Sequence, residues 1–307
     1  MAVSKPITPS MIKELRARTG AGMMDCKKTL DETGGDIDAA IEALRKKGIA
    51  TAEKKAGRIA AEGVIASAGN DAAGVLVEVN CETDFVAKDA SFRGYAERVA
   101  GAILAASPAA GDLEAVAALE VDDGGTVESV RRELVARIGE NISVRRFAVV
   151  RAAGDTGTVS AYLHGTRIGV MVGLTGGDPD ARKLGRDLAM HIAASHPLCI
   201  DEQDMPAEAV ERERAIFMAQ AEESGKPAEI AHKMVAGRMK KFLKENTLLG
   251  QPFIKDPERS IAQLVAAAGA TVEQMVRFEV GEGLEKRDDD FVAEVMAQAG
   301  GKSADSR

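Results

Sequence analysis

The chain has 307 residues and a formal net charge of −8. A net negative chain makes nucleic acid an unfavourable main partner, because neutralising phosphates requires a basic face. The length allows two or three compact domains. Hydrophobic residues make up 45% and charged residues 29% of the chain, a balance typical of a globular rather than a disordered protein.

Residues 1–55 are predicted to form a three-helix N-terminal domain. Gly20-Ala21-Gly22 separates a first helix from a second one over Met23 to Leu30. Asp36 is placed to cap a third helix, whose apolar residues follow at helical spacing. Gly48 is interpreted as the stop of that helix.

The next block, residues 56–157, is predicted to be a core subdomain in which the hydrophobic period changes from helical to alternating. Valines at every second position indicate the second strand of a hairpin. The expected elements are strands over 63–68 and 74–80, helices over about 89–106, 112–119 and 126–138, and a closing strand over 142–151.

A second core subdomain is predicted from residues 158–196 and 246–280, as an internal duplication of the first. A hairpin of strands 158–163 and 168–174 bends at His164-Gly165-Thr166, and a helix is expected over about 180–194. Three matches occur in the same order in both blocks. They pair Gly74-Val75-Leu76-Val77 with Gly169-Val170-Met171-Val172, Ile103 to Pro108 with Ile192 to Pro197, and Arg146-Phe147-Ala148-Val149 with Arg277-Phe278-Glu279-Val280.

Residues 197–245 interrupt the second copy. Two charged helices, over 206–223 and 227–244, predict an antiparallel helical hairpin that projects as an arm. Residues 281–307 are assigned to a C-terminal module with one more helix over 291–299. The whole is expected to be an α+β fold: a three-helix bundle, a duplicated α/β core with small antiparallel sheets, and an inserted hairpin of helices.

Motifs for catalysis or metal binding do not occur in the sequence. It contains neither a G-x-x-x-x-G-K-[ST] phosphate loop nor a G-x-S-x-G or H-E-x-x-H motif. His191 and His196 are spaced poorly for ligands on one helix face, and Cys81 lies beside acidic residues that disfavour its thiolate. We therefore expect no metal, no cofactor and no enzymatic activity.

The three cysteines are odd in number and form no C-x-x-C pair, which favours a reducing compartment. The N-terminus has no apolar signal-peptide core, and no apolar run is long enough to suggest a membrane span. A cytoplasmic protein without a membrane partner is the resulting expectation.

The segment from Cys81 to Lys88 is unusual because it places Phe85 in a loop between a strand and a helix. An exposed aromatic side chain of this kind can insert into a partner protein. Alternatively, Phe85 packs back onto the core while Thr83 or Asp84 caps the next helix. Residue types alone favour the inward packing, because apolar loop residues commonly face the core.

Several stretches together resemble bacterial elongation factor Ts. They span residues 15 to 283 in the order expected for that family, and their combination is highly specific. The stretches are LRARTGAGMMDCKKTL, VEVNCETDFVAKDASF, HGTRIGVMV, GRMKKF, GQPF and RFEVGEG. The resemblance implies a ubiquitin-associated-like N-terminal bundle, two related α/β halves and an inserted helical hairpin.

The resemblance also implies a partner and a mechanism: exchange of guanine nucleotide on elongation factor Tu with GDP bound. The segment Thr83, Asp84, Phe85 and Val86 would enter the partner's GTPase domain beside its magnesium site, with Phe85 as the wedge. This implication reverses the preference for an inward Phe85.

Further partner contacts are implied by the same resemblance. Arg16, Met23 and Met24 match N-terminal docking residues of the family, and His164 matches a position near the partner's phosphate loop. For the two methionines, a place in the helix core is the alternative; for His164 it is a plain turn residue. The arm could bind the partner or form a homodimer.

Two other functions stay open. An RNA- or ribosome-binding protein would use the basic clusters around residues 46–58 and 238–244, and its affinity would depend on salt. An enzyme with an unrecognised site would show turnover by itself.

Overall fold

The computed structural model describes residues 6–121, 125–177, 181–224 and 227–284. It confirms an α+β protein that combines helices with small antiparallel sheets. The first three-stranded sheet has the order β1-β2-β5, with β1 (Glu62–Gly69), β2 (Ala73–Cys81) and β5 (Ile142–Arg151). The second has the order β10-β7-β6, with β6 (Thr158–His164), β7 (Ile168–Gly176) and β10 (Ala270–Glu279). Two-stranded ladders join β3 (Glu120–Val121) to β4 (Gly125–Thr126) and β8 (Pro252–Phe253) to β9 (Asp256–Ser260).

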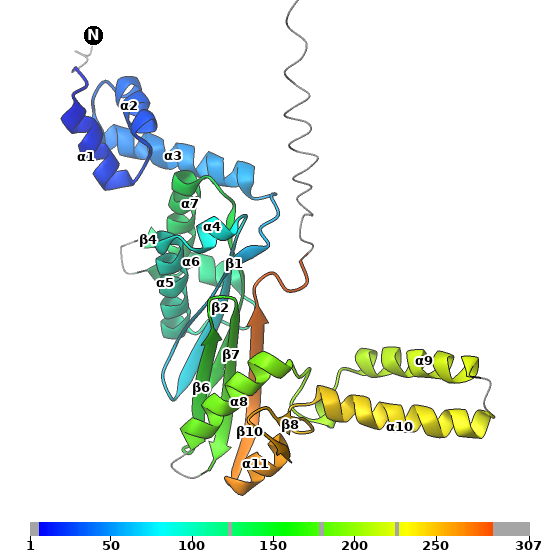
Figure 1. Ribbon diagram of the computed structural model, residues 1–307. Coiled ribbons are helices and arrows are strands. Elements are labelled where there is room, and N and C mark those ends of the chain that lie inside the picture. Colours follow the sequence, from blue (N-terminus) through cyan, green and yellow to red (C-terminus); the bar gives the residue numbers. More distant parts are fainter. Residues whose placement is uncertain (1–5, 122–124, 178–180, 225–226, 285–307) are drawn as a thin grey trace, which may run out of the picture.

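The two larger sheets pack against each other, and helices cover their outer faces (Figure 1). A cluster that includes Leu76, Val150 and Met171 fills the space between the sheets. The helices over the first sheet are α5 (Ala90–Ala106) and α7 (Val127–Ile138), with the shorter α4 (Asp84–Ala87) and α6 (Leu113–Ala118) beside them. Over the second sheet lie α8 (Ala181–Ser195) and α11 (Ile261–Ala267). Because β2 and β7 are the central strands of covered sheets, both of their faces are buried.

The duplicated sequence motif forms the contact between the two sheets. A Cβ placed on Gly74 of β2 would lie 2.7 Å from Met171 Sδ of β7, and one placed on Gly169 of β7 would lie 2.9 Å from Leu76 Cδ2 of β2. The first residue of each motif therefore accommodates the third residue of the other. Glycine at both positions allows the sheets to approach closely.

The second duplicated stretch repeats a backbone feature as well as a sequence. Among the described residues, Ser107 and His196 are the non-glycine positions with positive φ, and both have φ of 48°. Each ends a helix and donates its N–H to the carbonyl four residues before it, at 2.7 and 3.0 Å. A proline follows in each copy, so the helix cannot continue.

The N-terminal helices are α1 (Pro9–Thr19), α2 (Met23–Glu32) and α3 (Ile37–Lys55). Asp36 caps α3 as predicted, accepting a hydrogen bond from the Ala39 N–H at 3.0 Å. The prediction that Gly48 stops this helix is wrong, because α3 continues to Lys55. Gly48 is buried instead, and a Cβ there would lie 3.3 Å from Ala136 Cβ of α7. Its missing side chain lets α3 pack onto α7.

Helices α9 (Ala207–Glu223) and α10 (Ala228–Asn246) extend side by side from the body, after the 3-10 turn η1 (Glu202–Asp204) (Figure 1). Their shared core is small and consists of Ala221, Ala231, Val235 and Met239 with partly buried neighbours. The helix predicted over 291–299 lies outside the described residues. Within the described part of the chain, every helix is too short or too polar to cross a membrane.

Glu78 of β2 is a fully buried carboxylate that connects the two sheets. Its Oε1 accepts from Arg145 Nη1 at 2.9 Å and from the Gly281 N–H, beyond β10, at 2.8 Å; its Oε2 accepts from Arg146 Nε at 2.6 Å. A bulge in the β2–β5 ladder follows Glu78, so two consecutive arginines reach one carboxylate. Burial raises the pKa of Glu78, but the Gly281 N–H and the two guanidinium groups outweigh it and hold the pKa below its ordinary value.

Replacing Glu78 by alanine is expected to lower the free energy of unfolding by about 3–5 kcal/mol, because two partly buried arginines would lose their compensating charge. Urea denaturation measures this change. Glu42→Ala is the matched control, since Glu42 forms a similarly short but exposed ion pair with Lys46 at 2.7 Å. Equal effects of the two substitutions would contradict the structural role of Glu78.

His191 of α8 is buried, and its imidazole is hydrogen-bonded to polar groups of the second half. Its Nε2 faces Gln251 Oε1 at 2.9 Å, and its Nδ1 accepts from the Ile254 N–H at 3.3 Å. Burial lowers the pKa of His191. As pH falls, His191 therefore takes up a proton in the unfolded chain before it does so in the folded chain. The free energy of unfolding then decreases below about pH 6.5, by up to about 1.4 kcal/mol per pH unit. We expect His191→Gln to reduce the slope of unfolding free energy against pH between 7 and 5.5; an unchanged slope would contradict this assignment.

Candidate functional site

The candidate site starts where β2 ends and α4 begins. Thr83 is the N-cap of α4, and its Oγ1 accepts from the Val86 N–H at 3.4 Å. The Ala87 N–H donates to the Thr83 carbonyl at 3.3 Å, and the Asp89 N–H donates to the Val86 carbonyl at 2.9 Å. Residues 83–86 thus form a single capped turn, which we call the 83–86 segment.

The short helix divides its residues between core and solvent. Val86 and Ala87 are buried in the cluster below α5, whereas Phe85 is 80% exposed. Successive residues of a helix point about 100° apart, so turning Val86 towards the core directs Phe85 away from it. The expectation from residue types alone that Phe85 packs inward is therefore wrong.

Charged neighbours surround the exposed ring. Lys88 Nζ forms an ion pair with Asp84 Oδ2 at 2.6 Å and lies 5.9 Å from the centroid of the Phe85 ring. The hydrogen bond from Lys88 holds the pKa of Asp84 below its usual range. The site therefore presents an apolar ring beside an ionised carboxylate.

The α7–β5 turn holds the backbone that precedes the 83–86 segment. Glu140 Oε2 accepts from the Glu82 N–H at 3.1 Å and from the Thr83 N–H at 3.0 Å, and Glu140 Oε1 accepts from Thr83 Oγ1 at 2.6 Å. Glu140 was not among the contact residues predicted from the sequence. The only local signal was an acidic residue directly after a helix-ending glycine, and nothing in the sequence pointed to a loop 57 residues away.

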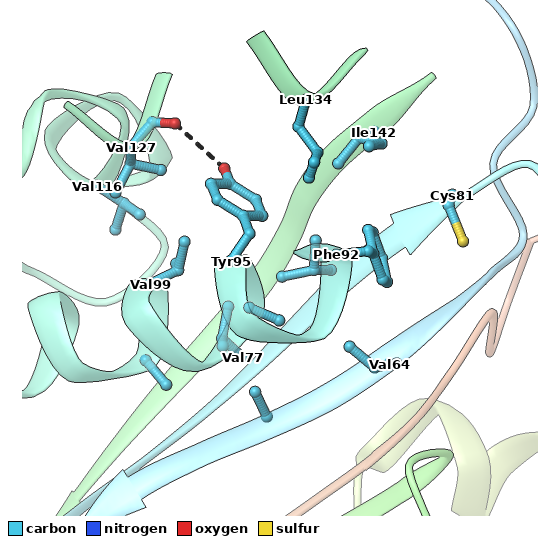
Figure 2. Packing of buried hydrophobic residues seen from close by; sticks show 14 of the residues in the cluster. Val64, Val77, Cys81, Phe92, Tyr95, Val99, Val116, Val127, Leu134 and Ile142 are labelled. Atoms are coloured by element: carbon cyan, nitrogen blue, oxygen red, sulfur yellow. Dashed lines mark hydrogen bonds between the residues drawn. The ribbon is translucent and has the colours of Figure 1, made fainter. Parts of the chain in front are cut away.

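Below this loop lies the main apolar core of the first half. Phe92 and Tyr95 of α5 are both fully buried in this core, and the Tyr95 ring points towards Val127, whose carbonyl accepts from the Tyr95 hydroxyl at 3.3 Å (Figure 2). Cys81 ends β2 at the edge of this core, and burial raises the pKa of its thiol to about 12. It therefore stays a thiol at neutral pH, in accord with the expectation that the thiolate is disfavoured at this position.

His164 is the last residue of β6 and is exposed at the bend of the second hairpin. Its Nδ1 lies 3.1 Å from the hydroxyl of Tyr162, which is two residues earlier on the same face of β6. The ring is thus available at the surface and has a defined partner.

The bend that carries His164 lies at the same end of the sheets as the 83–86 segment. The Ile65 N–H donates to the Thr166 carbonyl at 2.8 Å, and Arg167 forms an ion pair with Glu62 at 2.6 Å. Glu62 in turn pairs in register with Cys81, two residues before Thr83. The fold therefore gathers these two predicted contact regions from separate halves of the chain.

Arg16, Met23 and Met24 lie on the separate three-helix unit. All three are exposed, and the exposed fractions of the two methionines are 54% and 76%. The alternative that the methionines form helix core is wrong, because Leu15, Cys26 and Leu30 fill that core. The described residues contain no cluster of three or more His, Cys, Asp or Glu side chains that could hold a metal ion.

Comparison with known proteins identifies the family of the chain. The model of the family described as "Elongation factor TS" matches residues 82–282. Elongation factor Ts of Thioalkalivibrio sulfidiphilus is 57% identical over 297 residues, covering 96% of this chain and 99% of the relative. The chain belongs to the elongation factor Ts family. Elongation factor Ts proteins of Alkalilimnicola ehrlichii and Methylococcus capsulatus are each 56% identical, over 96% and 95% of this chain and 99% and 98% of those proteins.

Two phenylalanines seven positions apart in this chain should respond differently to truncation. Phe92 is fully buried, so Phe92→Ala is expected to lower the free energy of unfolding by about 3–5 kcal/mol. Phe85→Ala should change it by no more than about 0.5 kcal/mol, because the ring is mostly in solvent. Denaturant unfolding of both variants measures the difference. A large loss for Phe85→Ala would mean that the ring supports the fold.

Proposed function

We propose that this chain is the guanine nucleotide exchange factor for elongation factor Tu in translation elongation. The single observation that carries the proposal is the exposed Phe85, held on a braced, capped turn within a member of the elongation factor Ts family. An apolar ring with no core to stabilise it is suited to entering a partner. The reaction belongs in the cytoplasm, and it needs no cofactor of the exchange factor itself.

In the proposed mechanism, the 83–86 segment enters the GTPase domain of the GDP-bound partner beside its magnesium ion. Magnesium bridges nucleotide phosphates and protein groups and requires near-ideal octahedral geometry. Phe85 displaces side chains near the metal, and Asp84 makes a polar contact in the same place. Small displacements around the ion weaken nucleotide binding, so GDP leaves and GTP can enter.

The proposal requires no covalent chemistry in the exchange factor. Binding of the factor and binding of nucleotide oppose each other, and this coupling is reciprocal. If the factor lowers the affinity for GDP, nucleotide lowers the affinity for the factor by the same ratio. Fresh nucleotide then expels the factor, and the cycle can repeat.

The remaining partner contacts are assigned to other regions. Arg16, Met23 and Met24, on a three-helix unit that resembles ubiquitin-associated domains, dock on the partner away from the nucleotide. His164 contacts it near the phosphate loop. All four side chains are exposed, which such contacts require.

The arm is proposed to bind the partner or a second copy of the chain. Helix α9 carries five Glu and two Arg, whereas α10 carries two Glu and five Lys or Arg. Opposite charges on the two helices would favour antiparallel contact between two arms. Sedimentation of the chain with and without salt would detect such a dimer.

Release of fluorescent GDP from purified bacterial elongation factor Tu tests the proposed function. The wild-type chain is expected to accelerate release strongly, and Phe85→Ala to reduce the acceleration at least tenfold, about 1.4 kcal/mol of transition-state stabilisation. Leu113→Ala, which truncates an exposed apolar residue on α6, is the matched control and should behave as wild type.

Assays on the same protein sample distinguish the alternative functions. No acceleration by the wild-type chain would overturn the proposal. Salt-dependent affinity for RNA would then favour the RNA-binding alternative, and turnover by the chain alone would favour an enzyme.

A further inference from the structure

The orientation of Phe85 is not set by contacts of its own ring. The ring is 80% exposed, and the Lys88 ammonium group that lies 5.9 Å from its centroid is itself exposed. Helix α4 has four residues, which is far too short to be stable in isolation. The direction of Phe85 is therefore set by its neighbours: Val86 and Ala87, which are buried in the core, and the backbone at the start of α4.

Glu140 is the group that acts there. Its two carboxylate oxygens accept three hydrogen bonds, from the N–H groups of Glu82 and Thr83 and from the Thr83 hydroxyl. An ionised carboxylate forms stronger hydrogen bonds than a neutral acceptor does. The Thr83 hydroxyl donates to Glu140 and accepts from Val86, so Glu140 also orients the cap of the helix that carries Phe85.

The contact is reciprocal. Glu82 Oε1 accepts from the Asn141 N–H at 2.6 Å, while Glu140 accepts from the Glu82 N–H. Two loops that are nearly 60 residues apart thus exchange carboxylate-to-backbone bonds. We call Glu82 and Glu140 the carboxylate brace.

The brace is itself anchored on rigid elements. Gly139 ends α7 with φ of 87°, which turns the chain so that Glu140 faces the loop after β2. The Asn141 side chain donates to the carbonyls of Ala56 and Arg58, at 3.3 and 2.8 Å, and so attaches the end of the N-terminal unit to the same turn.

We propose that Glu140 is a positioning residue for nucleotide exchange, which holds the start of α4 so that Phe85 is presented in one orientation. This inference rests on the proposed exchange function, but it concerns a residue that does not enter the partner. It assigns the contact with the partner to Phe85 and the orientation of Phe85 to Glu140.

A double-mutant cycle with Phe85 distinguishes positioning from a general structural role. Glu140→Ala is expected to lower the maximal rate of GDP release from elongation factor Tu about tenfold, with a smaller change in the concentration that gives half-maximal acceleration. In the Phe85→Ala background the same substitution should change the rate less than twofold, because the side chain that Glu140 directs is already absent. Equal effects in both backgrounds would overturn the proposal.

One conservative variant and one control variant complete the double-mutant cycle. Glu140→Gln keeps an acceptor oxygen for the two N–H groups but loses the charge, so its rate should lie between those of wild type and Glu140→Ala. It also carries the cycle if the alanine variant does not fold. Glu133→Ala, on the exposed face of α7, should match wild type.

A second measurement is independent of the partner. Amide hydrogen exchange by mass spectrometry should show at least tenfold faster exchange in the peptide that contains residues 82–87 of Glu140→Ala, with β2 and α5 unchanged. Unchanged exchange there would overturn the positioning role even if nucleotide release slows. If the wild-type chain does not accelerate release at all, the proposed function fails, and this measurement alone decides whether Glu140 orders the 83–86 segment.

Discussion

The buried charge of Glu78 is the constraint on which the arrangement of the two halves depends. A carboxylate without solvent contact must be compensated, and its compensation comes from both sheets: two arginines of β5 and the backbone N–H of Gly281 beyond β10. Apolar packing between the sheets would tolerate small rotations, because it is not directional. The hydrogen-bonded charge does not, so it fixes how the second half sits on the first.

This fixed arrangement decides which loops share one end of the molecule. The bend after His164 bonds to the start of β1, and β1 in turn pairs with the end of β2, from which the 83–86 segment continues. Two surface features from different halves are therefore linked through β1. A protein that works by docking needs such rigidity, because each contact that must be ordered on binding reduces affinity.

The site divides its tasks among neighbouring residues. Val86 and Ala87 are buried in the core and anchor the turn. Glu140 and Thr83 hold its backbone by hydrogen bonds, and Phe85 is exposed to solvent. The stability of the fold and the proposed contact with a partner thus depend on different side chains. Exposed Met23 and Met24 repeat this division on the N-terminal unit, whose core is filled by Leu15, Cys26 and Leu30.

The sequence by itself determined the type and order of the longer helices and strands, because helical and alternating periods, caps and glycine breaks are local signals. It did not predict the short elements α4, α11, β3, β4, β8 and β9. The strands of both hairpins and the closing strand 142–151 were predictable in this way, whereas Phe85, predicted in a loop, lies in the short helix α4. Local signals could not decide whether Phe85 faces the core, because that depends on which neighbour takes the inward position. They also misassigned Gly48, where close packing of α7 outweighs helix propensity. The arginine and Gly281 partners of Glu78, and the partners of Glu140, were decided only by tertiary structure, since these hydrogen bonds join residues 57 or more positions apart.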